Sequence, residues 1–374
     1  MKKFITTEKQ ILKNIRIAFI IPSLRHGGTQ RFIINLLNHI NKNLFDIHLI
    51  ILDNSKGIQF KNEQINIYNL KAKRVRNSIF RLVKMIKKVD PEIIFTLQSH
   101  LSIYVILFKF LFKRKIKYVC RESNIPSQKN LDYRFPAIYN LLYKFTISRF
   151  DMLICQSNDM YDDLIKNYKI NQRILIKINN LIDTKLVNNL SNEKCLDEFQ
   201  YDFILCASTL SPQKGIDRLI DIVNLDNFKN NIKVAILGEG PLKEIYQRKI
   251  LKLGLDQNIK FYGLQNNPYK WIKRSKVYLL TSLFEGFPNV LLEAGILRKP
   301  SVCFDIKGGI SEIIIDGKNG FKIKDGDYKN FLEKMILSRD KKFDFNFIYN
   351  NIIEKYSPEV ITKKYENLLL NLIN

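Results

Sequence analysis

The stretch Val277–Glu293, which reads VYLLTSLFEGFPNVLLE, passes directly from a predicted buried strand into a predicted helix. Residues 277–281 form an apolar run of strand length, as in a parallel strand that is covered on both faces. Pro288 is favoured at the first position of a helix, so we expect the helix to begin between Gly286 and Asn289. Backbone N–H groups at such a helix N-terminus attract anions. The stretch therefore predicts an α/β fold with an anion site at the end of a strand.

The same alternation of strand and helix extends over the whole chain. Predicted strands lie at 16–21, 46–52, 65–70, 92–96, 117–121 and 151–155, and again at 202–207, 233–237, 260–262, 277–281 and 301–304. Between them lie stretches with helical spacing, and the pattern pauses in a polar segment at 183–200 before it restarts. We therefore predict two doubly wound, Rossmann-like domains that face each other across a cleft, with ligands bound at the carboxyl ends of the strands.

The length of 374 residues suits two domains. We expect an N-terminal Rossmann-like domain at 1–185, a linker at 186–199 and a C-terminal Rossmann-like domain at 200–355. We expect residues 356–374 to form a helix that packs back on the N-terminal domain.

Charge is distributed unevenly along the chain. The formal net charge is +25, and residues 1–190 hold 33 Lys and Arg against 13 Asp and Glu. Such an excess favours a phosphate-bearing partner, whether nucleic acid, anionic lipid or a small substrate. A general richness in Lys, Ile and Asn accounts for part of the excess but not for the difference between the halves. Because the sequence contains no nucleic-acid-binding motif, we expect no nucleic-acid partner, although a basic nucleic-acid-binding protein is one alternative.

Cysteine usage and hydropathy indicate a cytoplasmic protein. The five cysteines are widely spaced and form no C-x-x-C pair, which favours neither disulfides nor a thiolate metal site. The first 14 residues are not typical of a secretory signal, and the longest apolar stretch, 101–112, is shorter than the roughly 20 residues that span a bilayer.

Two carboxylates flank the predicted anion site. Glu285 lies in the loop before the helix and Glu293 lies more than one turn inside it. Carboxylates do not bind phosphate, but they accept hydrogen bonds from vicinal sugar hydroxyls. Taken as an isolated pair, the two would instead be a surface loop acid and a helix acid.

Other predicted strand ends supply groups suited to phosphate. Lys214 follows a strand in the segment Ser211-Pro212-Gln213-Lys214-Gly215 and is a suitable point cation. Gly27 and Gly28, at the turn after the first strand, allow the backbone to approach a ligand closely, although such a pair is equally typical of a plain turn.

Taken in order, these motifs resemble those of the family 4 glycosyltransferases, which have the GT-B fold. The matching elements are Gly27-Gly28 with Gln30-Arg31, the segment 211–215, Gly238-Glu239-Gly240-Pro241, the pair Glu285 and Glu293 with Gly286-Phe287-Pro288, and Gly308-Gly309 through Gly320. The resemblance implies retaining transfer of a sugar from a nucleotide-diphosphate donor, most often a uridine diphosphate (UDP) sugar such as a UDP-hexose or UDP-N-acetylhexosamine. It implies no metal and no other cofactor.

The resemblance also implies that the domain at 1–185 binds the acceptor and that the domain at 200–355 binds the nucleotide sugar. It further implies roles for individual residues. Glu285 would bind hydroxyls of the donor sugar, and Glu293 would bind the ribose hydroxyls. The diphosphate would lie against Gly27 and Gly28 on one side and against the backbone of the second segment on the other, with Lys214 neutralising its charge. That second segment consists of Gly286, Phe287, Pro288, Asn289 and Val290.

The sequence departs from the family pattern at two places. The family usually has an Arg five residues before its Lys, where this chain has Thr209, so Arg25 or Arg31 is the candidate replacement. The family often has a His or Asp after the fifth strand, where this chain has Arg121 and Glu122. These two are candidates for acceptor or phosphate contacts, or else a local ion pair.

Two further positions carry candidate chemistry. His100 follows the fourth predicted strand and either faces the cleft or serves as a capping or core residue. Asp325 and Asp327 have a spacing used for metal in other glycosyltransferases, but they precede a predicted helix at Tyr328. We therefore interpret them as a turn and a helix N-cap, and we predict no catalytic metal.

The acceptor is predicted from charge and hydropathy. The apolar helix predicted at 101–112 is followed by the basic run 113–117, which favours docking on an anionic membrane, or else an interior helix with lysines at its end. A second basic tract covers 71–88. The hypothesis is a peripheral enzyme on the inner face of the cytoplasmic membrane that uses a lipid-linked, lipopolysaccharide or capsule glycan acceptor. The main alternative is a UDP-sugar 2-epimerase of the same fold.

Overall fold

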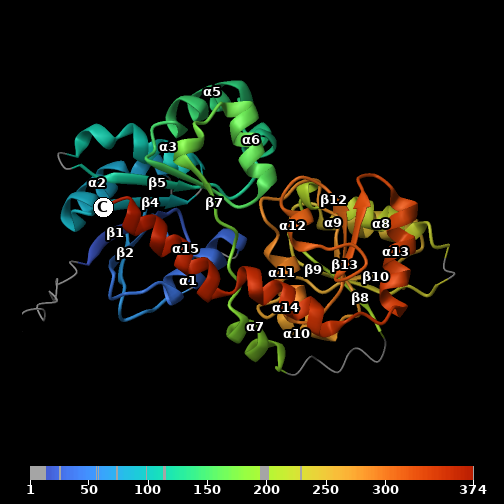
Figure 1. Cartoon of the computed structure of the whole chain (residues 1–374). Coiled ribbons are helices and arrows are strands. Elements are labelled where there is room, and N and C mark those ends of the chain that lie inside the picture. The colour runs from blue at the N-terminus through green and yellow to red at the C-terminus, as the bar shows by residue number, and fades with distance from the viewer. Residues whose placement is uncertain are drawn as a thin grey trace, which may run out of the picture.

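The computed structural model describes residues 14–24, 27–55, 57, 59–72, 75–97, 99–112, 115–193, 202–227 and 230–373. These residues form two open sheets, one of seven strands in the order β3-β2-β1-β4-β5-β6-β7 and one of six in the order β10-β9-β8-β11-β12-β13. All pairings between these strands are parallel. The two doubly wound domains predicted from the sequence are therefore confirmed, and they lie side by side in Figure 1.

The N-terminal sheet has almost fully buried strands at its centre and more exposed strands, β3 and β7, at its edges. Its strands are β1 (Ile15–Ile21), β2 (Phe45–Ile51), β3 (Asn66–Asn69), β4 (Ile93–Leu97), β5 (Lys117–Arg121), β6 (Met152–Cys155) and β7 (Leu175–Lys177). Helices cover both faces, namely α1 (Gly28–His39), α2 (Val75–Val89), α3 (Ser99–Leu107), α4 (Pro126–Lys129), α5 (Pro136–Ile147) and α6 (Asn158–Tyr168). Because both faces are covered, alternate residues of β1 enter opposite cores, with Phe19 in one and Ile20 in the other.

The C-terminal sheet has the same construction around one core. Its strands are β8 (Ile204–Ala207), β9 (Val234–Leu237), β10 (Ile259–Phe261), β11 (Tyr278–Leu280), β12 (Ser301–Asp305) and β13 (Gly320–Lys324). Its helices are α8 (Ile216–Asn224), α9 (Lys243–Lys252), α10 (Tyr269–Arg274), α11 (Asn289–Ile296), α12 (Ile310–Ile313), α13 (Tyr328–Asp340) and α14 (Phe345–Tyr356). Short 3-10 turns occur at η1 (Lys109–Leu111), η2 (Asn130–Asp132), η3 (Gln172–Ile174) and η4 (Pro212–Lys214).

The segment between the domains begins with a helix rather than an extended linker. Helix α7 (Thr184–Ser191) occupies the first part of the predicted linker, 186–199. Asp183 caps this helix by accepting a hydrogen bond from the Leu186 N–H at 2.9 Å, and Val187 is buried in the C-terminal core. A capped helix of eight residues, with Val187 and Ser191 buried, thus occupies the first part of a segment that is otherwise polar.

The last helix, α15 (Pro358–Asn371), carries the chain back to the N-terminal domain. Ile361, Tyr365 and Leu369 join a core formed by β1 and α1, and the Tyr365 and Phe32 rings lie 5.7 Å apart. In Figure 1 the helix runs from the second lobe to the first and ends beside β1. The chain therefore crosses between the domains twice, once around α7 and once through α15, and both crossings connect the two domains.

Helix α3 occupies most of the apolar stretch 101–112 and is an interior helix. Its residues Leu101, Ile103, Val105 and Ile106 are buried in the core of the N-terminal domain. The hypothesis that this helix docks on a membrane is therefore wrong, because its apolar face already packs between the sheet and α5. In the part of the chain that the structure describes, no helix combines the length and apolar character needed to cross a bilayer.

Candidate functional site

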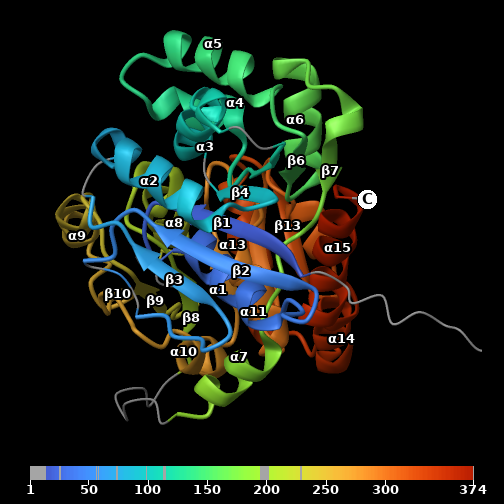
Figure 2. The same ribbon diagram turned by 90° about the vertical axis from the view of Figure 1, so that its left-hand side faces the viewer.

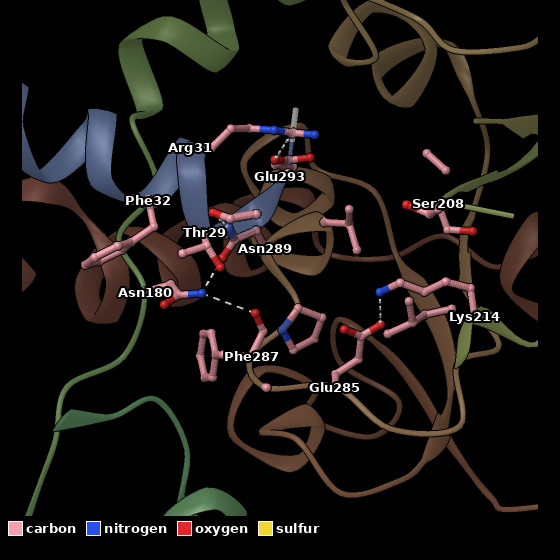
Figure 3. Close-up of a pocket in the computed structure, with 18 of the residues that line it drawn as sticks. Thr29, Arg31, Phe32, Asn180, Ser208, Lys214, Glu285, Phe287, Asn289 and Glu293 are labelled. Carbon is pink, nitrogen blue, oxygen red and sulfur yellow. Dashed lines mark hydrogen bonds and ion pairs between the residues drawn. The ribbon is translucent and has the colours of Figure 1, made fainter. Parts of the chain in front are cut away.

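A cavity of about 490 Å³ lies between the two domains, at the carboxyl ends of both sheets (Figure 3). The N-terminal domain lines it with the start of α1 and the loop after β5. The C-terminal domain lines it with the loop after β8, the residues after β9 and the loop that leads into α11. Parallel α/β sheets bind ligands at this edge, so two such edges that face each other make the cavity the candidate site.

Two helix N-termini face each other across the cavity. Helix α1 begins at Gly28 and α11 begins at Asn289, and the Asn289 side-chain amide donates a hydrogen bond to the Gly28 carbonyl at 3.2 Å. The first N–H groups of a helix have no partner within the helix, and the helix dipole adds positive potential there. Gly27, Gly28 and Gly286–Val290, all predicted to bind the diphosphate, line the cavity together.

Glu285 and Lys214 form an ion pair at the cavity wall. The Lys214 ammonium lies 2.6 Å from Glu285 Oε1, and the Ser282 hydroxyl donates to the same oxygen at 2.7 Å. Glu285 is buried, so these two contacts fix a carboxylate that has little access to bulk water. Lys214 is thereby held at the cavity edge, where Figure 3 shows its ammonium pointing toward Glu285.

Glu293 lies deeper, and a cation from the opposite domain pairs with it. The Arg31 Nη1 of α1 lies 2.6 Å from Glu293 Oε1, and the Glu293 side chain is only 2% exposed. Glu293, followed by Tyr269, raises the pKa of the Arg31 guanidinium against the effect of burial. Arg31, a candidate for the missing cation near Thr209, therefore pairs with the carboxylate predicted to bind ribose.

Arg121 belongs to the cavity wall but is held by partners that the sequence did not indicate. It is 1% exposed, donates to Tyr365 Oη at 3.0 Å and to Asn180 Oδ1, and stacks 3.5 Å above the Phe32 ring. Burial lowers the pKa of this guanidinium. Its Nη1 is buried with no hydrogen-bond partner among the described residues. Arg121 therefore places a positive charge at the cavity wall, and no described residue accepts a hydrogen bond from its Nη1.

Asn180 connects this arginine to the other domain. Its side-chain amide donates to the Phe287 carbonyl at 3.2 Å and to Asn289 Oδ1 at 2.5 Å. Asn180 and Tyr365 carry no motif, and they meet Arg121 only because the segment after β7 and the middle of α15 lie beside it. Sequence reasoning missed both for this reason.

Glu122 and His100 do not lie with the other predicted residues. Glu122 points into the domain core, where its carboxylate accepts a hydrogen bond from the Tyr143 hydroxyl at 2.9 Å. His100 is half-buried in the first turn of α3, where burial lowers its pKa, and it is not among the described residues that line the cavity. Its predicted catalytic role therefore has no support from its position. Arg25 lies outside the described residues.

The Asp325 and Asp327 pair has the structural role that we predicted. Asp327 caps α13 by accepting from the Asn330 N–H at 3.1 Å, and Asp325 pairs with Arg218. In the described part of the chain, no three His, Cys, Asp or Glu side chains form a group that could hold a metal ion.

Two facing parallel sheets with converging helix N-termini, a lysine and two buried carboxylates between them are typical of the GT-B fold. Two family models match the chain. One, described as Glycosyltransferase Family 4, covers residues 26–186, and the other, described as Glycosyl transferases group 1, covers residues 188–352. The chain thus belongs to the family 4 glycosyltransferases and is a glycosyltransferase.

Relatives of established name are polysaccharide and glycolipid enzymes. A Campylobacter jejuni N-acetylgalactosamine-N,N'-diacetylbacillosaminyl-diphospho-undecaprenol 4-alpha-N-acetylgalactosaminyltransferase is 27% identical over 346 residues, which is 87% of this chain and 91% of that protein. A Staphylococcus aureus poly(ribitol-phosphate) alpha-N-acetylglucosaminyltransferase is 30% identical over 63% of this chain and 53% of that protein.

Solved structures share the fold over almost the whole chain. Anabaena Alr3699/HepE in complex with UDP superposes with a TM-score of 0.76 at 17% identity, covering 96% of this chain and 100% of that one. The lipopolysaccharide outer core galactosyltransferase WaaB gives a TM-score of 0.72 at 19% identity, covering 96% of this chain and 99% of that one. The GT-B fold predicted from the sequence is confirmed.

Proposed function

We propose that the protein transfers a sugar, with retention of anomeric configuration, from a UDP-sugar to a lipid-linked or polysaccharide acceptor. The observation that carries this proposal is the arrangement of Glu285, Lys214 and Glu293 around the N-terminus of α11, at the edge of a cavity shared by both domains. The printed names of the C. jejuni and S. aureus relatives and of the UDP complex of HepE agree with it.

The donor would lie along α11. The first turns of α11 and α1 would face the diphosphate from opposite sides, and Lys214 would neutralise charge that develops on it as the sugar leaves. Glu293 would accept hydrogen bonds from the ribose hydroxyls, sharing its carboxylate with Arg31 or displacing that side chain. Glu285 would orient hydroxyls of the transferred sugar.

Retention is supported by the distribution of acids in the cavity. The carboxylates among the described lining residues, Glu239, Glu285 and Glu293, all come from the C-terminal domain. The N-terminal domain, which would hold the acceptor, contributes backbone, amides and the cations Arg31 and Arg121. We propose that a phosphate oxygen of the departing diphosphate takes the acceptor proton from the same face as the attack.

We further propose that transfer needs no metal. Lys214, Arg121 and the two helix N-termini provide positive potential where a metal would otherwise act. Transfer measured with and without a chelator should therefore proceed at the same rate, whereas loss of activity that magnesium or manganese restores would contradict this part.

The acceptor is proposed to be presented at the inner face of the cytoplasmic membrane. The N-terminal half carries most of the positive charge and forms the side of the cavity opposite the donor motifs. A lipid diphosphate or another anionic glycan carrier would match that charge.

Thermal stabilisation by a panel of nucleotide sugars tests the donor class. We expect UDP and one or more UDP-sugars to raise the melting temperature, and we expect release of UDP when a polyprenyl-diphosphate-linked glycan is added. No stabilisation by any UDP compound would refute the donor assignment. Conversion of the donor alone into its C2 epimer would identify the protein as an epimerase instead.

A further inference from the structure

Helix α5 exposes an apolar face on the outside of the N-terminal domain. Ile138, Leu141, Leu142 and Phe145 are 68%, 72%, 37% and 55% exposed. Their spacing places all four on one face of the helix. Figures 1 and 2 both show α5 along the outer edge of the domain. The exposed face is therefore a continuous apolar stripe about two turns long.

The opposite face of the same helix is firmly anchored. Tyr143, Thr146 and Ile147 are buried, and the Tyr143 ring lies edge-on to Tyr168 at 4.8 Å. The Tyr143 hydroxyl donates to the buried Glu122 at 2.9 Å. Because the inner face is satisfied in this way, the outer stripe cannot be buried by rotating the helix.

Neighbouring segments extend the stripe. Leu131 and Phe135, which precede α5, are each 60% exposed. Leu131 lies in η2, which packs against α5, and Phe135 is the N-cap residue of α5. We call Leu131, Phe135 and the four α5 side chains the α5 surface. So large a group of exposed apolar side chains indicates an interaction site.

Basic side chains are interleaved with the apolar ones. The Arg149 guanidinium stacks 3.7 Å above the Phe145 ring, and that of Arg134 lies 5.4 Å from the Phe135 ring. Lys144 is exposed on α5 itself. The exposed acid in this region, Asp132, is already paired with Lys129 at 2.7 Å. The surface therefore combines apolar side chains with uncompensated positive charge.

We propose that the α5 surface docks on an anionic phospholipid bilayer. Its apolar side chains would enter the boundary between headgroups and acyl chains, while Arg134, Lys144 and Arg149 would reach the lipid phosphates. A second copy of the chain fits the surface less well, because two such faces would bring the same three cations together.

Docking by α5 would also set the position of the cavity. Ser123 and Asn124 line the cavity, and from Asn124 the chain leads directly through α4 and η2 into α5. The acceptor side of the cavity thus lies on the domain that carries the α5 surface. This inference rests on the proposed function, because docking would serve a lipid-linked acceptor. Its test does not require glycosyltransferase activity.

Vesicle sedimentation at low salt tests the proposal with the full-length protein. Vesicles of phosphatidylcholine alone are compared with vesicles that also contain phosphatidylglycerol. The variant Leu141→Gln/Phe145→Gln removes apolar surface without changing charge. The matched control is Ile245→Gln/Leu251→Gln, since both side chains are exposed apolar residues on α9 of the other domain. Stabilisation by UDP is measured for all three proteins.

We expect the wild type and the α9 control to sediment with the phosphatidylglycerol vesicles. The α5 variant should partition at least tenfold more weakly, while UDP stabilises all three proteins equally. The proposal is overturned if the wild type stays in the supernatant or if the α5 variant binds like the wild type. A wild-type dimer that the α5 variant converts to a monomer would also overturn it. Failure of the proposed function would appear separately, as absence of UDP stabilisation.

Discussion

Glu293 is one of the carboxylates that join the two domains. Its buried side chain belongs to α11 of one domain, and its partner Arg31 belongs to α1 of the other, 2.6 Å away. A nucleotide that binds Glu293 would therefore act on a contact between the domains. The same contact links donor binding to the relative position of the domains.

Glu293→Gln should weaken UDP binding by about tenfold to a hundredfold, because a hydrogen bond to a charged group contributes about 1.5–3 kcal/mol. Isothermal titration with UDP measures this loss. The matched control is Glu312→Gln, which removes another contact between the domains: Glu312 lies 2.8 Å from Lys177 and accepts from the Asn158 N–H, away from the lining of the cavity. Equal losses in both variants would show that Glu293 acts only through domain position.

Lys214→Met should lower kcat/KM by about a hundredfold or more, because it removes a cation placed where charge develops on the leaving diphosphate. Lys214→Arg should retain part of the activity. Lys249→Met is the control, since Lys249 pairs with Asp221 at 2.6 Å and neither residue is among the described residues that line the cavity. Steady-state kinetics with the best donor measure kcat/KM for each variant. A Lys214→Met enzyme with wild-type kcat/KM would show that Lys214 does not contribute to catalysis.

The loop before α11 is the element that brings the two domains into backbone contact. A Cβ added at Gly286 would lie 2.4 Å from the Ser123 carbonyl oxygen, in the loop after β5 of the other domain. Only a residue without a side chain allows this approach. The close approach of Ser123, a residue distant in sequence, thus explains why the motif Glu285-Gly286-Phe287-Pro288 has a glycine at its second position.

Gly286→Ala should therefore force the domains apart and weaken UDP binding by about tenfold or more. Small-angle scattering and UDP titration of the variant and the wild type together measure the effect. If Gly286→Ala binds UDP as tightly as the wild type, the close approach does not matter for the donor site.

Lys299, just after α11, lowers the free energy of unfolding by an amount that depends on pH. Burial, followed by the neighbouring Lys276 and Arg274, lowers its pKa from 10.5 to about 8. Between pH 8 and 10.5 the unfolded chain would therefore bind more protons at this lysine than the folded protein, so the free energy of unfolding rises with pH across this range. Below pH 8 the charged Lys299 destabilises the folded protein to its full extent. Lys299→Met should raise the melting temperature at pH 7 by about 2–4 °C, for a gain of about 1 kcal/mol.

The gain from Lys299→Met should shrink as the pH approaches 10.5, where the folded protein already holds the neutral amine. Calorimetry at the two pH values measures the difference, with Lys252→Met on the exposed side of α9 as the control. A gain that is independent of pH would assign the effect to packing rather than to charge.

The central elements could be predicted from the sequence because each strand there is buried on both faces. β1, β4, β8 and β11 are continuous apolar runs, whereas the edge strand β13 reads Gly-Phe-Lys-Ile-Lys and was missed. β7, at the edge of the other sheet, was missed for the same reason. For the stretch 101–112 the sequence left membrane docking and an interior helix as alternatives, because an apolar helix looks alike whether a lipid or a neighbouring helix covers it.

The cavity between the domains and its wall bring together residues that could be predicted from the sequence and residues that could not. Gly28, Lys214, Glu285 and Glu293 each follow a strand within a short motif, so one stretch of sequence is enough to identify them. Asn180 and Tyr365 reach Arg121 from segments 59 and 244 residues away along the chain. Only the folded arrangement of β7 and α15 brings them there.

A crystal structure of the protein with UDP is the decisive measurement for the donor site. We expect the diphosphate between the first turns of α1 and α11, within reach of Lys214, and the ribose hydroxyls on the Glu293 carboxylate. UDP bound elsewhere, or bound in this cavity with its ribose away from Glu293 and its phosphates away from α11, would contradict the proposed donor site.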